Sequence, residues 1–459
     1  MSQAEPRPSG SGSELEDLAA SAVKRALESG ATGAECTISE GEEFSAQVRM
    51  RQVENLKQAG SRGVGIRVLI GRKSGSSYTS DLSPSGIESM VRAALELGRF
   101  AEEDPHAGLP DPSDLGRLDA DLRLYDDAIA GMETDSKIVQ ALQAEEAALS
   151  ADPRIQNSEG ASFDSYLGAH IFVNSLGFSG FYRTSSCALG AAPVAKSNGS
   201  MERDYWQTAA RRLAAIESPS EVGLHAARRA LRRLNPRKIA TQKAPVIFDP
   251  LTARCLLSEF FDAVNGNAIY RHASFLAGKL GERIASEALT VVDDATLPGL
   301  FGTSPFDDEG VATRRNVVVE RGVLKSYLLN TYSARKLGLH TTGNASRGLA
   351  GSAGVGPGNL FIEAGTVSEE EIIRGVRQGL YVTEMIGASA NTVTGDFSGG
   401  AAGLWIENGE LAYAVSGITI AGNLKQMLAD VQQVASNLEF RHSVESPSIL
   451  IGEMTISGI

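Results

Sequence analysis

Apolar and polar residues recur along the first half of the chain with two different spacings. In segments 44–51 and 64–70 they alternate with a period of two, which predicts half-buried strands that pair as antiparallel neighbours. In segments 15–27, 84–95 and 133–149, apolar residues return every three or four positions, which predicts helices. The first half therefore mixes helices with antiparallel strands.

Turn residues organise the second half. Asn408-Gly409 lies between two alternating segments and is the strongest hairpin signal of the sequence, and Arg321-Gly322 predicts a second hairpin. The apolar run Pro245–Phe248 predicts a short strand. The breaker Asp249-Pro250 separates that strand from a helix predicted over residues 251–264.

Together these patterns predict a mixed α+β fold with largely antiparallel sheets, helices and two domains. We expect a disordered polar tail over residues 1–12 and an N-terminal mixed α/β domain over residues 13–217. A connecting helix is expected within residues 218–242, and a C-terminal β-rich domain over residues 243–459.

The connecting helix begins with a clear start signal. Ser218 and Glu221 form a predicted capping box, and Pro219 takes the first helical position. Four basic residues follow: Arg228, Arg229, Arg232 and Arg233. They would suit either a basic patch for a partner or a solvated face near the helix C-terminus, and the solvated face is favoured.

Composition narrows the class of protein. The chain has 459 residues, 42% of them hydrophobic, which is enough for at least two cores. Its net charge of -13 disfavours nucleic acid or an anionic membrane as the main partner. The cysteines Cys36, Cys187 and Cys255 are far apart and no segment is apolar enough to cross a bilayer, so we expect a cytoplasmic protein.

Six short segments, in a fixed order, carry a family likeness. They are Val291–Asp294, Phe306–Gly310, Val323–Leu328, Tyr332–Gly338, Thr342–Asn344 and Trp405–Glu410. By these segments the chain resembles the TldD/PmbA family, and most of all its PmbA branch, also called TldE. The likeness is specific from about Glu221 to the C-terminus, and the first half agrees in length and order of elements.

The resemblance implies a two-subunit cytoplasmic zinc protease. In such a pair the TldD-type chain carries an H-E-x-x-x-H helix and a later cysteine, and the TldE-type chain pairs with it around an enclosed site. Aligned with that helix, this chain has Ser258 and Ala263 at the two histidine positions and Glu259 at the glutamate position. The resemblance thus places zinc in the TldD-type partner and no cofactor in this chain.

The requirements of a zinc site explain why these substitutions matter. A hydrolytic zinc site needs about three protein ligands with nitrogen, sulfur or carboxylate lone pairs, and one position for water. A serine hydroxyl is a poor ligand, an alanine methyl is none, and a general base without metal-bound water has nothing to activate. Residues 437–459 contain no cysteine and offer only His442. We therefore expect neither catalytic residues nor metal ligands in this chain.

Three other groups of residues are candidates for function. An atypical metal set would comprise Cys255, Glu259, Asp262 and His272, although a buried thiol and a solvated histidine are the favoured roles. The small residues of Thr394–Gly400 would let another backbone approach, which makes Asp396, Ser398 and Gly399 candidates for peptide contact; a bulged strand is the alternative. The acidic runs 293–294 and 307–309 invite a calcium site, but roles in turns are favoured.

Three functional hypotheses follow. The first is a TldE/PmbA-type subunit that shapes the chamber and peptide groove of a heterodimeric TldD/TldE metalloprotease acting on unfolded or extended peptides. The second is a metallopeptidase active on its own through an atypical site. The third is a homodimeric peptide-binding protein. The first hypothesis also leaves open a homodimer when the partner is absent.

Overall fold

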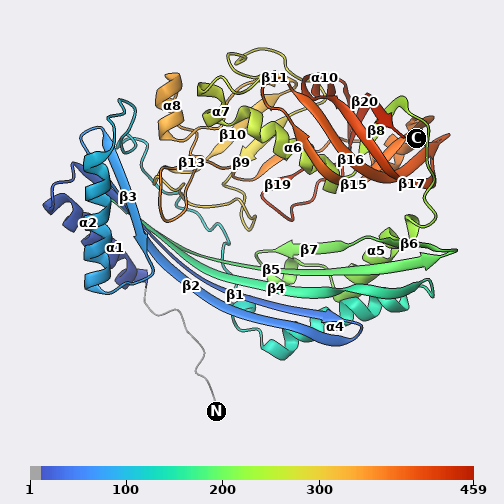
Figure 1. Ribbon diagram of the computed structural model, residues 1–459, viewed down its shortest axis with the longest axis horizontal. Coiled ribbons are helices and arrows are strands. Elements are labelled where there is room, and N and C mark those ends of the chain that lie inside the picture. The colour runs from blue at the N-terminus through green and yellow to red at the C-terminus, as the bar shows by residue number, and fades with distance from the viewer. Residues whose placement is uncertain (1–11, 459) are drawn as a thin grey trace.

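The computed structural model describes residues 12–458 (Figure 1). The expected disordered tail lies outside the described residues, apart from Gly12, at which helix α1 (Gly12–Glu28) begins. Helices and mainly antiparallel sheets alternate along the chain, so the predicted α+β class is confirmed. Within residues 12–458 no helix has the length and apolarity needed to span a bilayer.

The first part of the chain builds one long, curved antiparallel sheet (Figure 1). Its order is β3-β2-β1-β4-β5-β6, and β7 also pairs with β5. The strands are β1 (Gly33–Arg49), β2 (Gln52–Ile70), β3 (Lys73–Thr79), β4 (Ile155–Asn174), β5 (Ser179–Ser197), β6 (Ser200–Arg203) and β7 (Trp206–Ala210). The predicted strand at 64–70 is only part of β2, because residues 52–63 are exposed with hardly any buried position and show no alternation. The predicted strand at 44–51 ends two residues early, since β1 stops at Arg49 and residues 50–51 form the turn to β2 with positive φ.

Two pairs of helices cover the outer, convex face of this sheet, one pair at each end (Figure 1). The first pair, α1 and α2 (Pro84–Phe100), buries Val23 and Met90 against Ile38. The second pair, α4 (Thr134–Ser150) and α5 (Pro219–Arg232), packs on Phe163 and Leu189, and the short helix α3 (Asp127–Ala130) precedes it. The region between the two pairs remains a groove on the outer face.

A six-stranded sheet forms most of the second part. Its order is β17-β16-β15-β8-β20-β18, and β17 also pairs with β20, so the sheet curls back on itself. The strands are β8 (Gln242–Phe248), β15 (Gln378–Ala390), β16 (Asp396–Glu407), β17 (Glu410–Asn423), β18 (Val431–Val434) and β20 (Ile449–Ser457). Strands β8 and β15 are parallel, whereas the other neighbours are antiparallel.

A smaller sheet has the order β11-β10-β9-β14-β19, with β14 and β19 parallel. Its strands are β9 (Val291–Asp294), β10 (Arg315–Glu320), β11 (Val323–Leu324), β14 (Leu360–Ile362) and β19 (Val444–Glu445), and a short hairpin joins β12 (Ala345–Ser346) to β13 (Gly354–Val355). The remaining helical elements are η1 (Leu213–Ala215), α6 (Pro250–Val264), α7 (Gly266–Tyr270), α8 (Thr331–Leu337), α9 (Glu369–Gly375) and α10 (Leu424–Ala429).

Both predicted hairpins of the second half are confirmed. Asn408 and Gly409 take φ of 51° and 82° between β16 and β17, and Arg321 and Gly322 take φ of 45° and 81° between β10 and β11. Two successive residues with positive φ match the twist of the flanking strands, which is why Asn-Gly is favoured at such turns.

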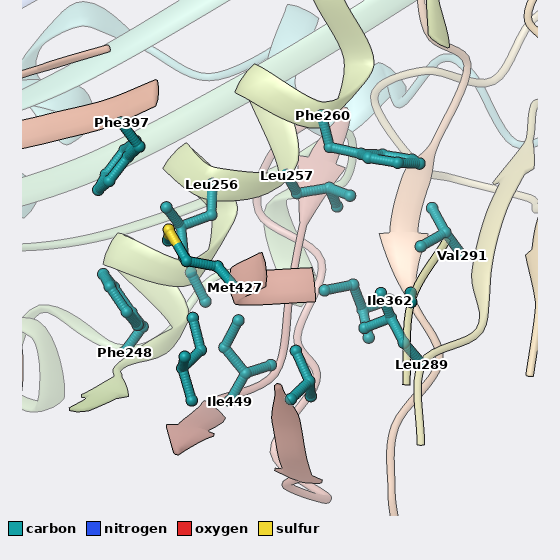
Figure 2. Packing of buried hydrophobic residues seen from close by; sticks show 14 of the residues in the cluster. Phe248, Leu256, Leu257, Phe260, Leu289, Val291, Ile362, Phe397, Met427 and Ile449 are labelled. Carbon is teal, nitrogen blue, oxygen red and sulfur yellow. The ribbon is translucent and has the colours of Figure 1, made fainter. Parts of the chain in front are cut away.

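Helix α6 is central to the core of the second part (Figure 2). Its residues Leu256, Leu257 and Phe260 pack against Phe248 from the six-stranded sheet and Val291 from the smaller sheet. A helix buried on that side has only its opposite face available for other partners. The fold therefore fixes the rotation of the helix on which the family's metal motif is expected.

Buried contacts join the concave face of the long sheet to loops of the second part. Phe306 packs edge-on against Tyr182 from β5, and the Arg347 guanidinium forms a buried ion pair with Glu35 of β1. Arg211 donates to the carbonyl oxygens of residues 300 and 301. These contacts link the two parts over a wide area, and the domain boundaries expected at 218–242 stay a prediction.

Candidate functional site

The start of α6 explains its position. The Asp249 carboxylate accepts a hydrogen bond from the Thr252 N–H at 2.9 Å, and Pro250 takes the first helical position. Aspartate at the N-cap satisfies an otherwise unpaired amide, and proline pre-sets the backbone angle there. The helix consequently begins immediately after the parallel strand β8, with Ser258, Glu259 and Asp262 away from its buried face.

The three positions aligned with the metal motif are engaged in structural contacts. The Ser258 hydroxyl donates to the Arg254 carbonyl one turn earlier, at 3.1 Å. The Glu259 carboxylate accepts a hydrogen bond from the Ala390 N–H at 2.7 Å, which ties α6 to the end of β15. Ala263 is fully buried in the core. One hydroxyl, one methyl and one hydrogen-bonded carboxylate do not fit the ligand set of a hydrolytic zinc ion.

His442 lies beside α6, in the loop between β18 and β19. Burial, and after it the nearby charges of Arg254 and Arg441, lower its pKa to about 4. The imidazole is therefore neutral at pH 7, as a metal ligand must be. Two guanidinium groups in the same surroundings nevertheless repel a divalent cation, so His442 does not complete a zinc site.

The atypical metal set is not assembled in the structure. In residues 12–458 no group of three or more His, Cys, Asp or Glu side chains is placed to hold a metal ion. The Cys255 thiol donates weakly to the Leu251 carbonyl at 3.5 Å, and burial raises its pKa. His272 is exposed beyond α7 in a left-handed conformation, with φ of 54°. The expectation of no metal ligand in this chain stays a prediction.

The connecting helix differs from its expected form. Its capping box and Pro219 are present as predicted, but the arginine run is not a solvated face. Arg229 is only 4% exposed, and it forms ion pairs with Asp204 and Asp249, each at 3.3 Å. The arginines are less exposed than expected because acidic side chains from segments before and after α5 reach the last turns of this helix. Of Arg228 and Arg229, only Arg228 is exposed.

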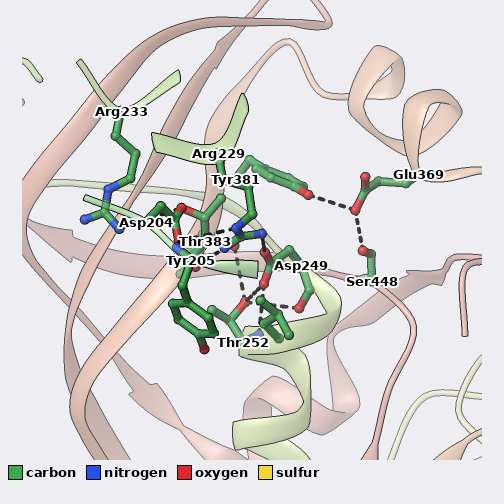
Figure 3. Close-up of polar contacts among 12 residues, drawn as sticks. Asp204, Tyr205, Arg229, Arg233, Asp249, Thr252, Glu369, Tyr381, Thr383 and Ser448 are labelled. Atoms are coloured by element: carbon green, nitrogen blue, oxygen red, sulfur yellow. Dashed lines mark hydrogen bonds and ion pairs between the residues drawn. The ribbon is translucent and has the colours of Figure 1, made fainter. Parts of the chain in front are cut away.

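Arg229 thereby connects three parts of the chain at the start of α6 (Figure 3). Besides its two carboxylate partners, it donates to the Thr383 carbonyl of β15 at 3.2 Å. Arg233 adds ion pairs to Asp204 and to Glu384. The burial of the charges is offset only because each has an opposite charge close by. This network holds α6, β15 and the β6–β7 link in one arrangement.

The segment that holds the peptide-contact candidates is paired on both sides. Ser398 lies opposite Ser389 of β15 and Ala421 of β17, with a register shift in β15, so neither edge of β16 is open here. Asp396 is exposed and accepts from Thr394 and Asn423. A peptide would reach this segment through exposed side chains rather than by strand addition. Contact at Asp396, Ser398 and Gly399 stays a prediction.

Asp307 acts in a turn, the role that the sequence favours for the acidic runs, whereas Asp293 lies within strand β9. Asp307 accepts hydrogen bonds from the N–H groups of Glu309, Val311 and Ala345. Asp293 is fully buried, and burial raises its pKa to about 6, although Asn344 donates to it at 2.8 Å. These contacts bind neighbouring loops to the small sheet, which is a structural function.

Comparison with known proteins agrees with this geometry over nearly the whole chain. Residues 34–98, 127–234 and 241–458 match the first, central and C-terminal domains of the PmbA/TldA metallopeptidases. The chain is 40% identical to Metalloprotease PmbA of Escherichia coli O157:H7 over 440 residues, which cover 95% of each protein. It belongs to the PmbA/TldD metallopeptidase family.

Solved structures of other proteins show the same fold. A Bacteroides thetaiotaomicron protein described as a candidate modulator of DNA gyrase is 30% identical, with a TM-score of 0.89 and coverage of 97% of this chain and 99% of that one. TldE of Thermococcus kodakarensis superposes with a TM-score of 0.86 over 97% of this chain and 100% of that one. At 22% identity the second comparison establishes the fold alone.

Sequence reasoning missed two features of the PmbA/TldD chain described here. The buried Arg229 network was hidden because its carboxylates come from distant segments, and arginines near a helix end are usually solvated. The groove on the outer face of the long sheet is assembled from β1, β2, β4 and the start of α4. Its lining carries both acidic and basic side chains, but no local motif marks it.

Proposed function

We propose that this chain is the TldE/PmbA-type, non-catalytic subunit of a heterodimeric metalloprotease, and that it completes the enclosed site of a zinc-bearing TldD-type chain. The observation that carries the proposal is the chemistry of α6. Ser258 and Ala263 stand at the two histidine positions, and the Glu259 carboxylate is held by the Ala390 amide. In this proposal zinc, when bound by the TldD-type chain, activates the attacking water.

The role of this chain is then to position and to enclose. The Arg229 network fixes α6 against β15, so the surface beside the site is rigid before a partner or peptide binds. Pre-organisation of this kind lowers the ordering cost of binding. The substrates in this proposal are unfolded or extended peptides, whose main chain is free to form hydrogen bonds. All three cysteines are free, which suits a reducing cytoplasm.

Two preparations test the proposal: the chain alone, and the chain co-expressed with a TldD-type chain from the same organism. We expect zinc only in the co-purified complex, together with cleavage of a flexible fluorogenic peptide that a chelator abolishes. Glu259→Gln in this chain should leave that turnover unchanged, whereas changing the motif glutamate of the TldD-type chain should abolish it.

The competing hypotheses predict different results. Stoichiometric zinc and chelator-sensitive cleavage by the chain alone would establish a peptidase that acts by itself. Failure to capture any zinc-bearing partner, with a dimer that binds but never cleaves peptide, would establish a homodimeric peptide-binding protein. Either result removes the proposed function.

A further inference from the structure

The outer face of the long sheet carries a groove that the proposed function does not use. It has a volume of about 910 Å³ and lies between the two helix pairs that cover this face. Strands β1, β2 and β4 form its floor, and residues 130–134 with Lys137 form a wall. Apolar and charged side chains line it together: Phe44, Met132, Leu167, Glu40, Glu42 and Arg183.

One side of the groove is an open sheet edge. Strand β2 pairs with β1 along its whole length, but β3 pairs only with residues 64–70. Within the part of the chain that the structure describes, no strand pairs with the other side of residues 52–63. An unpaired edge presents a row of amide and carbonyl groups that can accept another strand. Gly60 and Ser61 belong both to this edge and to the groove lining.

Gly60 leaves the entrance to the groove wide. A Cβ atom at this position would meet nothing closer than the Gly41 carbonyl oxygen, at 4.0 Å. The neighbouring outward positions on the same face are Gln58 and Arg62, so the glycine is a gap in a row of long side chains. A side chain from an added strand would enter the groove through this gap.

Glu40 supplies chemical selectivity. The residue is only 9% exposed and its carboxylate lines the groove, yet in residues 12–458 that carboxylate makes no hydrogen bond or ion pair. The neighbouring Glu42 instead accepts from Gln58 at 2.9 Å. Two cations of the lining contact rings: Lys137 lies over Phe44, and Arg183 lies over the Tyr125 ring. A carboxylate on the wall of the groove offers a ligand cation a charge-assisted hydrogen bond.

We propose that this groove binds an extended peptide as an added strand on the open edge of β2, with a lysine or arginine side chain of the peptide directed at Glu40. The proposal rests on the proposed function for peptides as the class of ligand. It adds a docking site on the outer face of the long sheet, opposite to the concave face that meets the second part. Such a site would hold one part of a long substrate while another part reaches the enclosed site.

Fluorescence anisotropy with the full chain alone tests this binding. The probes are labelled flexible peptides of about ten residues, enough to follow the open edge at roughly 3.3 Å per residue. One probe carries a central lysine, a second norleucine and a third glutamate. We expect the lysine probe to bind most tightly, and Glu40→Gln to weaken it about tenfold while leaving the norleucine probe unchanged, because a hydrogen bond to a charged group is worth at least that factor.

Backbone recognition has its own test. In an added strand, every second amide of the peptide faces the edge of β2. N-methylation of alternate residues in one register should therefore abolish binding, whereas methylation of the other register should be tolerated. Equal effects in both registers, or equal affinity for the lysine and norleucine probes, would overturn the proposal.

A bulky substitution in the groove, compared with the same substitution elsewhere, tests where the peptide binds. Gly60→Trp should block the groove and remove binding of the lysine probe. Gly375→Trp is the matched control, because a Cβ there meets nothing within 4 Å and the position lies in α9 of the second part. Light scattering must show the same mass for all variants. A wild-type dimer that Gly60→Trp converts to a monomer would instead assign the edge to a second copy of the chain and refute peptide docking.

The experiments distinguish failure of the groove proposal from failure of the proposed function. Zinc-dependent cleavage by the complex together with no peptide binding to the chain alone would refute only the outer groove. Peptide binding that needs Glu40 and Gly60, without any zinc-bearing partner, would refute only the protease assignment.

Discussion

The network around Arg229 makes a quantitative prediction about stability. Arg229→Met removes a guanidinium that lies 3.3 Å from both Asp204 and Asp249, and it retains much of the aliphatic bulk. Asp249, at 1% exposure, then remains buried without a cation, whereas Asp204, at 4% exposure, keeps only the longer ion pair with Arg233, at 3.9 Å. The Thr383 carbonyl also loses a donor.

The size of the effect follows from this burial. Breaking a buried ion pair by removal of one partner costs about 3–5 kcal/mol, because the remaining charge is left uncompensated in a poorly solvated site. We expect the free energy of unfolding to fall by an amount in that range. Asp204→Asn combined with Asp249→Asn should recover part of the loss in the Arg229→Met background, since no buried charge then lacks a partner.

Urea titration followed by tryptophan fluorescence measures the change. Trp206 stands near Arg229 in the first part of the chain, and Trp405 lies in β16 of the second. Single-tryptophan versions therefore report each part separately. We expect the two transitions to coincide in the parent chain and to separate in Arg229→Met, because the network connects α5 to both α6 and β15.

Arg228→Met is the matched control. Arg228 is the preceding residue of the same helix and is exposed, so its replacement should change stability by no more than about 0.5 kcal/mol. If Arg229→Met and Arg228→Met have equal effects, the buried network contributes nothing to stability and the argument fails.

Three further predictions concern single sites. Burial raises the pKa of Asp293 to about 6, so the Asp293 carboxylate destabilises the folded state increasingly as the pH rises from about 4 to above 6. Relative to the parent chain, Asp293→Asn should therefore gain about 2 kcal/mol of unfolding free energy between pH 4 and pH 7. Gly223→Ala should lose about 1–3 kcal/mol in thermal or urea unfolding, because its Cβ would lie 2.2 Å from the Ala144 carbonyl oxygen, whereas Gly375→Ala, in open space, should not destabilise. Glu259→Gln should lower the free energy of unfolding by about 1 kcal/mol, because a glutamine side chain accepts a weaker hydrogen bond from the β15 amide than a carboxylate does. A larger loss of stability together with loss of bound metal would contradict the structural role of Glu259.

Local signals in the sequence predict the elements well. The Asn408-Gly409 turn, the Ser218 capping box and the start of α6 at Asp249-Pro250 each depend on a few adjacent residues, and each is present in the structure. The outer half of β2 does not follow from pattern, because residues 52–63 are exposed on nearly every position and carry no alternation. Its strand geometry comes from pairing with β1.

The candidate site is less accessible to sequence reasoning. The motif alignment identifies which side chains stand on α6, but not that Glu259 is bonded to the β15 amide 131 positions later. The sequence predicts Arg229 to be a surface residue, because its partners Asp204 and Asp249 come from segments before and after its helix and meet it only in the folded chain. Glu40 lies in an ordinary strand, and its isolation appears only once the lining residues of the groove are placed around it.

The order of strands in the six-stranded sheet has a consequence for biosynthesis. Strand β8 is made early in the second part but lies between β15 and β20, and its antiparallel neighbour extends to Ile456. Contacts so distant along the chain close slowly, and a nascent chain on the ribosome cannot form them until both segments have emerged. The edge of β8 that pairs with β20 must therefore remain unpaired through the translation of some two hundred residues. Chaperone demand during synthesis should accordingly concentrate on this strand.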